Sequence, residues 1–189
     1  MGAGTSKANT ALLHTGFDAR PGTLEARLVA RGHELLSEYA PRTGIPTARV
    51  GALLVAWSEE QLAELPAIVD QAEQNGYTAI RRLGVDELYR LEPRLGPGAH
   101  GALEIPEEGI VCPFTTPLAF ATEAVAAGCK LRLDTRVAGV RRDSDAFVVE
   151  TSSGEVGTRF LVNAAGLYSD EIDRMLGYER FTVNRGAAS

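Results

Sequence analysis

Apolar strand-like runs alternate with capped amphipathic segments along this sequence, and that order restricts its possible folds more than any other feature. Residues 48–57 are typical of a strand, and Ser58 then begins a helical pattern with Gln61 at the capping-box position. Upstream, residues 23–40 carry apolar side chains at helical spacing behind Thr23, which is typical of an N-cap. The alternation predicts α/β or mixed α+β organisation, with both parallel and antiparallel strand pairs.

Prolines, glycines and threonines predict where the helices begin and end. Pro41 and Gly44 are expected to end the first long helix, because both residue types break helices. Pro66 is expected to kink the second helix or to mark a junction in it. Thr115 or Thr116 is expected to cap a later helix. Three strand-like segments follow that helix: residues 130–143, 146–154 and 158–170.

Charge and composition exclude several classes of protein. A net charge of −6 and a pI near 5.2 argue against nucleic acid as the main partner, which requires clustered lysine and arginine. No apolar stretch approaches the roughly 18 residues that cross a bilayer, and no secretory signal is predicted. Cys112 and Cys129 lie far apart without metal-ligand spacing, so two free thiols in a reducing cytosol are expected. The predicted location is cytoplasmic, with peripheral membrane contact as the alternative.

Three segments carry residues suited to chemistry, each with a structural alternative. His14 lies in a loop of small residues, where an imidazole is either a base at neutral pH or a surface histidine. Residues 4–9, "GTSKAN", either cradle a phosphate or form a flexible polar arm. Residues 160–170, "FLVNAAGLYSD", either approach a ligand closely through small side chains or form a strand-to-helix turn. Cys112 is expected to be buried as a small apolar residue, and no metal site is predicted.

Three motifs resemble one family of flavoproteins. The segments "GAGTSKANTALLHTGFDARPGTLEARL", "EEGIVCPF" and "FLVNAAGLYSDEIDRMLG" are similar to the glycerol-3-phosphate dehydrogenase and L-2-hydroxyglutarate oxidase branch of the D-amino-acid-oxidase-like (DAO) superfamily. The similarity runs from about Gly2 to about Asn184. It implies a partial FAD-binding Rossmann-like domain with an inserted antiparallel-sheet substrate lobe. The expected division is 1–47 for a loop and helix of the FAD domain, 48–111 for part of the lobe, and 112–189 for the FAD domain again.

The resemblance also implies roles for ten positions. The loop residues expected to contact the flavin and its diphosphate are Thr5, Ser6, Lys7 and Asn9. Leu13 and His14 are expected beside the isoalloxazine ring, with His14 the candidate catalytic residue. The backbone of Val137 is expected to meet the adenine, and the small residues passing close to the cofactor are Ala164, Ala165 and Gly166.

The sequence also departs from the family pattern. The family's first strand, its G-x-G-x-x-G loop and the strand ending in glutamate do not precede residues 4–9 here, and the C-terminal part with substrate-binding basic residues is not present either. The resemblance therefore implies an internal fragment that binds FAD weakly or not at all, has no turnover alone, and self-associates through exposed sheet edges.

The activity implied for the parent protein is oxidation of glycerol 3-phosphate or a small 2-hydroxy acid by hydride transfer to FAD. Its expected partner is thus a small anionic substrate. Two alternatives remain open: an amino-acid or amine oxidase of the same superfamily, and a structural or interaction fragment without catalysis.

Overall fold

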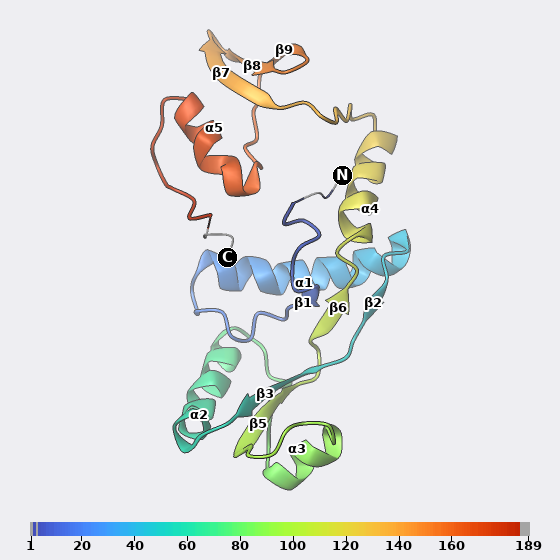
Figure 1. Cartoon of the computed structure of the whole chain (residues 1–189), viewed down its shortest axis with the longest axis vertical. Helices are drawn as coiled ribbons and strands as arrows, with labels where there is room; N and C mark the ends of the chain where they lie inside the picture. The colour runs from blue at the N-terminus through green and yellow to red at the C-terminus, as the bar shows by residue number, and fades with distance from the viewer. Residues whose placement is uncertain (1, 3, 186–189) are drawn as a thin grey trace. The chain divides into compact units, whose positions relative to one another are not determined.

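The chain forms two compact units, which are described separately (Figure 1). The computed structural model describes residues 2 and 4–185, and the units are Met1–Cys129 and Lys130–Ser189. Helices and strands alternate along the chain, and the strands form three small sheets. This confirms the mixed α/β class. Every strand pair within the described residues is antiparallel, so the parallel pairs expected from the sequence are not found there.

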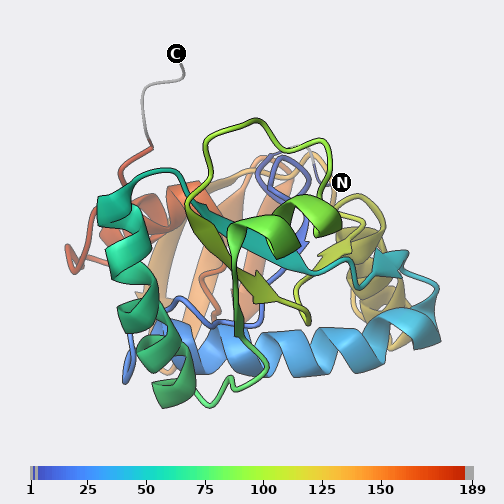
Figure 2. The same cartoon turned by 90° about the horizontal axis from the view of Figure 1, so that it is seen from below.

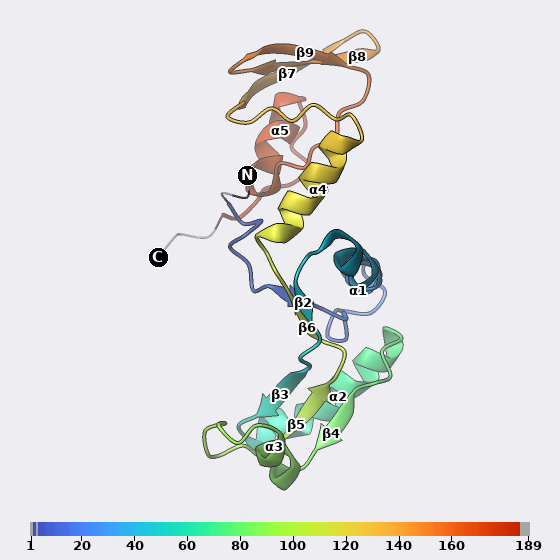
Figure 3. The ribbon, with the colours of Figure 1, turned by 90° about the vertical axis from the view of Figure 1, so that its right-hand side faces the viewer.

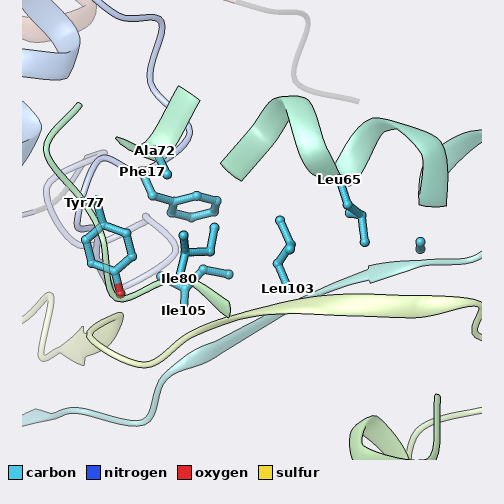
Figure 4. Close-up of a cluster of buried hydrophobic side chains, with 8 residues drawn as sticks. Phe17, Leu65, Ala72, Tyr77, Ile80, Leu103 and Ile105 are labelled. Atoms are coloured by element: carbon cyan, nitrogen blue, oxygen red, sulfur yellow. The ribbon is translucent and has the colours of Figure 1, made fainter. Parts of the chain in front are cut away.

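The core of the first unit lies around a three-stranded sheet of order β3-β5-β4. Its strands are β3 (Ala52–Ala56), β5 (Gly101–Ile105) and β4 (Arg81–Leu83). Leu103 and Ile105 of β5 pack with Leu65 of helix α2 (Glu59–Gln74), as Figure 4 shows. Ala102, the residue before Leu103, packs with Leu88 of helix α3 (Val85–Leu91). Because successive strand residues point to opposite faces, β5 is covered on both sides.

A second small sheet brings distant segments of this unit together. Its order is β1-β6-β2, with β1 (Leu12–Leu13), β6 (Gly109–Val111) and β2 (Thr47–Ala48). A side chain at Gly109 would place its Cβ 3.0 Å from the Ala48 carbonyl oxygen, so glycine permits this close pairing. Leu13 pairs directly with Gly109. The residue after β1, His14, and the residue before β6, Glu108, are therefore neighbours.

Helix α1 (Leu24–Thr43) begins where the sequence predicts and ends slightly later. The Thr23 hydroxyl accepts a hydrogen bond from the Ala26 N–H, and Gly44 ends the helix with a left-handed φ of 72°. Pro41 lies inside the last turn, so the prediction that it ends the helix is wrong. The leucine spacing correctly predicts a helix. The leucines that carry this spacing are nevertheless exposed in this unit: Leu24, Leu28 and Leu35. Figure 2 shows α1 as the long helix along the lower edge of the view.

Helix α2 confirms the predicted cap, and Pro66 marks no junction in it. The Ser58 hydroxyl accepts the Gln61 N–H at 3.3 Å. In a standard capping box, the side chain of Gln61 would accept the N–H of the N-cap residue, Ser58. Here its oxygen accepts the N–H of the preceding residue, Trp57, at 2.7 Å. The helix continues through Pro66 without interruption. A proline removes one helical hydrogen bond. The helix persists because the buried residues on either side of Pro66, Leu65 and Ala72, keep it packed on the sheet.

Helix α4 (Thr115–Ala126) does not use the predicted threonine cap. The residue at the N-cap is Phe114, without a side-chain capping bond. Thr116 donates its hydroxyl to the Cys112 carbonyl at 2.8 Å, and the buried Thr115 hydroxyl makes no hydrogen bond within the described residues. Both threonines therefore lie inside the helix, where a hydroxyl faces the preceding turn instead of the free N–H groups.

The second unit contains an antiparallel meander and a short helix, visible together in Figure 3. Its elements are β7 (Val137–Asp143), β8 (Ala146–Thr151), β9 (Gly154–Thr158), a 3₁₀ turn (Gly166–Tyr168) and α5 (Ser169–Met175). The apolar segment after β9 joins no sheet of the described residues, and Phe160 and Val162 are 83% and 85% exposed. The predicted strand over 158–170 is therefore wrong, because a strand needs a neighbour to pair its backbone.

A buried carboxylate fixes α5. Asp170 is 2% exposed and accepts hydrogen bonds from Arg174 at 3.1 Å and from Arg185 at 2.7 Å. Burial raises the pKa of Asp170, but the hydrogen bonds from Arg174 and the Val183 N–H, with the charge of Arg185, outweigh it. The net result is a pKa held below its ordinary value.

Acid is expected to loosen this unit. A carboxyl whose pKa is lower in the folded state stabilises the fold above its ordinary pKa of 3.8, and this stabilisation is lost as the pH falls through the lower folded value. The NMR signal of the Met175 methyl group, on α5, reports the transition. Asp170→Asn is expected to remove this pH dependence, whereas Asp145→Asn, an exposed control, retains it. An unchanged acid transition in Asp170→Asn would contradict the assignment.

Candidate active site

His14 is held by a buried carboxylate that lies far away in the sequence. Its Nδ1 atom lies 3.1 Å from Glu108 Oε2, and the side chains of His14 and Glu108 are 44% and 3% exposed. The other carboxylate oxygen, Oε1, accepts the Thr15 N–H at 2.7 Å and the Thr15 hydroxyl at 2.8 Å. The Glu108 backbone is fixed too, because its carbonyl accepts the Gly51 N–H at 2.9 Å. One edge of the imidazole is thus anchored and the rest reaches solvent.

Such a pair suits proton transfer. An imidazole is a base near neutral pH, and a carboxylate on one ring nitrogen orients the ring and leaves the second nitrogen for a substrate. Within the described residues, His14 Nε2 makes no hydrogen bond. The pair therefore has the geometry of an oriented general base.

The loop at residues 4–9 is folded by Asn9. The Asn9 amide donates to the Ser6 carbonyl at 3.1 Å, and its oxygen accepts the Ala11 N–H at 2.8 Å. This is the turn geometry that asparagine favours. Asn9 thus shapes the loop, while Thr5, Ser6 and Lys7 expose their side chains. Two hydroxyls and an ammonium on consecutive residues are a donor set that suits a phosphate.

Leu13 occupies the last position of β1, directly before His14. It is half-buried, and it lies against Gly109, since a Cβ built there would be 3.7 Å from Leu13 Cβ. The pairing of β1 with β6 therefore fixes the point at which His14 leaves the sheet.

Two predicted cofactor positions in the second unit line one cavity. Val137 and Ala165 border a cavity of about 450 Å³. The other lining residues are Arg136, Tyr168, Glu171, Ile172 and Met175. Ala164 and Gly166 are exposed and do not line it, and Gly166 has a left-handed φ of 56°. A cavity with mainly apolar walls and an aromatic side chain suits a planar ring.

The small-residue turn beside this cavity is fixed by Asn163. The Asn163 amide donates to the Ser169 carbonyl at 2.8 Å, and its oxygen accepts the Ala165 N–H at 3.2 Å. Asn163 thus acts in this turn as Asn9 acts in the loop at residues 4–9. Neither role is predicted from the sequence above, although each asparagine stands two residues before the N–H that its side-chain oxygen accepts.

Glu108, Thr15, Asn163 and Tyr168 are candidate site residues that the sequence prediction missed. Glu108 is inside the motif "EEGIVCPF", in which the cysteine is the residue type more often associated with chemistry. Cys112 is half-buried, not fully buried as expected, and both cysteines are free thiols as predicted. The predicted positions fall into two groups, residues 5–14 in the first unit and 137–166 in the second.

The residues present fit an FAD cofactor by the chemistry of their donors. In the first unit, the exposed hydroxyl and ammonium groups of residues 5–7 suit a diphosphate. In the second, the cavity beside Val137 suits an aromatic ring system. No cluster of three or more His, Cys, Asp or Glu side chains able to hold a metal occurs in the part of the chain that the structure describes. None of the helices within residues 4–185 has the length and hydropathy that a bilayer crossing requires.

Comparison of the sequence with protein families gives one match over nearly the whole chain. The DAO family, described as FAD dependent oxidoreductase, matches residues 1–186. A glycerol 3-phosphate dehydrogenase of Caloramator mitchellensis is 30% identical over 183 residues, which cover 97% of this chain and 38% of that protein. The mitochondrial L-2-hydroxyglutarate dehydrogenase of Mus musculus is 31% identical, covering 89% of this chain and 39% of that protein. The chain thus spans less than half the length of these relatives.

The fold is also similar to those of solved oxidase structures. The FAD-bound, dithionite-reduced L-α-glycerophosphate oxidase of Mycoplasma pneumoniae superposes with a TM-score of 0.89 at 25% identity, covering 94% of this chain and 48% of that chain. Glycine oxidase of Geobacillus kaustophilus superposes with a TM-score of 0.80 at 27% identity, covering 94% and 49%.

Proposed function

We propose that this chain, which belongs to the DAO family of FAD dependent oxidoreductases, supplies the proton-accepting side of an FAD-dependent oxidation of a small anionic alcohol. The proposed substrates are glycerol 3-phosphate and small 2-hydroxy acids, because relatives at 30% and 31% identity carry the names of dehydrogenases for such molecules. The observation that carries the proposal is the contact of His14 with buried Glu108.

Each residue has a proposed task. His14 accepts the hydroxyl proton of the substrate at Nε2, while Nδ1 faces Glu108. Thr5, Ser6 and Lys7 bind the diphosphate of the cofactor, and Asn9 keeps their loop folded. In the second unit, Val137 and Ala165 border the cavity, and the backbone of Val137 is proposed to meet the adenine. Ala164 and Gly166, in the turn beside the cavity, are proposed to pass close to the cofactor. A bound FAD would supply the hydride acceptor for this oxidation.

The three-part division at residues 47/48 and 111/112, the cytoplasmic location and self-association through sheet edges stay predictions. In the proposed function, residues 48–111 belong to the lobe that covers the substrate. Leu13, at the end of β1 and directly before His14, would lie beside the flavin ring.

An anaerobic bleaching assay tests the proposed function. FAD-loaded protein containing residues 1–189 is mixed with glycerol 3-phosphate, L-2-hydroxyglutarate or glycine, and flavin absorbance is followed. Bleaching by one of the first two substrates supports the proposal. Bleaching by glycine alone would favour the amine-oxidase alternative, for which the likeness to glycine oxidase is the specific observation. Bleaching by none of the three would favour a structural role.

A further inference from the structure

Both carboxylate oxygens of Glu108 have protein partners. It is 2% exposed, so solvent does not replace its protein partners. Oε1 accepts two donors from Thr15, the N–H at 2.7 Å and the hydroxyl at 2.8 Å. Oε2 is therefore the oxygen that faces His14 Nδ1, at 3.1 Å. The three contacts therefore hold the carboxylate plane between Thr15 and His14.

An ionised carboxylate only accepts hydrogen bonds, and this fixes the imidazole. A neutral imidazole has one N–H donor and one bare nitrogen, and the partner of one nitrogen decides which tautomer is present. With Oε2 of Glu108 against Nδ1, the proton belongs on Nδ1. The lone pair then lies on Nε2, which makes no hydrogen bond within residues 4–185. Only this tautomer leaves a base on the open side of the ring.

The surrounding backbone gives the carboxylate little freedom to move away. Glu108 accepts the Gly51 N–H through its carbonyl at 2.9 Å and donates its own N–H to the Ile105 carbonyl at 3.3 Å. The next residue, Gly109, pairs with Leu13, which precedes His14. The two sides of the contact are thus held by one pair of strands.

We infer that Glu108 is a positioning residue for His14: it holds Nδ1 protonated and so keeps Nε2 as the proton acceptor. The inference rests on the proposed function for the role of His14 in catalysis, but the tautomer is a property of the chain alone. Glu108 does not touch substrate in this assignment. It acts through the imidazole, with Thr15 fixing its orientation.

Glu108→Gln is expected to reverse the tautomer without changing the side-chain volume. The glutamine oxygen must face the two donors of Thr15, because its amide group would otherwise oppose a buried N–H and a hydroxyl. The amide NH₂ then points at Nδ1 and donates to it. The imidazole proton moves to Nε2, so the ring presents a donor where the base was.

Imidazole nitrogen NMR shifts of histidine-labelled chain, recorded without flavin in alkaline buffer, measure this directly because they distinguish a protonated ring nitrogen from a bare one. The wild-type chain is expected to show Nδ1 protonated and Nε2 bare, and Glu108→Gln is expected to exchange the two shifts. Glu107→Gln is the matched control: it removes a charge from the same turn without touching His14, and the wild-type pattern is expected.

The outcomes separate this inference from the proposed function. A wild-type chain with the proton on Nε2 would overturn the inference, whether or not Glu108→Gln folds, and so would a folded Glu108→Gln protein with unchanged shifts. In the FAD-loaded protein, Glu108→Gln is expected to lower kcat about 100-fold or more with KM little changed. An exchanged tautomer without substrate-dependent bleaching in any variant would support the inference and contradict only the proposed function.

Discussion

His14→Ala is expected to lower kcat about 100- to 10,000-fold in the FAD-loaded protein, the range that a general base contributes. The physical reason is that the proposed function makes the imidazole its base, with Nδ1 held 3.1 Å from Glu108 Oε2. FAD affinity is expected to stay near the wild-type value, because the proposed diphosphate donors lie in residues 5–7. Stopped-flow flavin reduction gives the rate, and fluorescence titration gives the affinity.

His33→Ala is the matched control. His33 lies on α1 and its Nε2 is 3.2 Å from the Glu107 carbonyl, so it contacts the same turn as His14 but not the Glu108 carboxylate. Flavin reduction is expected to remain near the wild-type rate in this variant. An unchanged kcat in His14→Ala would remove His14 from the chemistry, and equal losses in both variants would assign the effect to the turn instead of the base.

The sequence points to only part of this candidate site. His14 and residues 4–9 stand out in the sequence because their loop, small residues and polar groups are contiguous. Glu108 was missed because its contact with Thr15 crosses 93 positions of the chain and depends on the pairing of β1 with β6. Two short strands of two and three residues carry no alternating pattern from which that pairing could be predicted.

In the fold, too, features that depend on neighbouring residues were predicted, whereas features that depend on distant contacts were not. The caps at Thr23 and Ser58 were predicted because a hydroxyl and the N–H that it accepts are three residues apart. The segment around Phe160 was mispredicted as a strand, since a strand depends on a partner strand, and Pro66 marks no junction in α2. Leucine spacing predicted that α1 is a helix, but periodicity alone did not determine which of its residues are covered.

The stability of the first unit depends most on the central strand of its larger sheet. Leu103 of β5 is fully buried and packs in one cluster with Leu65, Phe17 and Ile105 (Figure 4). Both neighbouring strands pair with β5, since Leu103 lies opposite Leu54 on one side and Arg82 on the other. The backbone around Leu103 is therefore held in place, and the structure has little freedom to collapse into a cavity made there.

Leu103→Ala is accordingly expected to lower the free energy of unfolding of this unit by about 2–5 kcal/mol, because the lost apolar contacts and the remaining cavity both cost stability. Urea denaturation followed by the fluorescence of Trp57, the chain's one tryptophan and the residue after β3, measures the change in this unit. Leu54→Ala is the matched control: it removes the same atoms from the directly opposite position, where the leucine is 37% exposed, and a much smaller loss is expected. Equal losses in the two variants would mean that β5 is not the centre of the packed core.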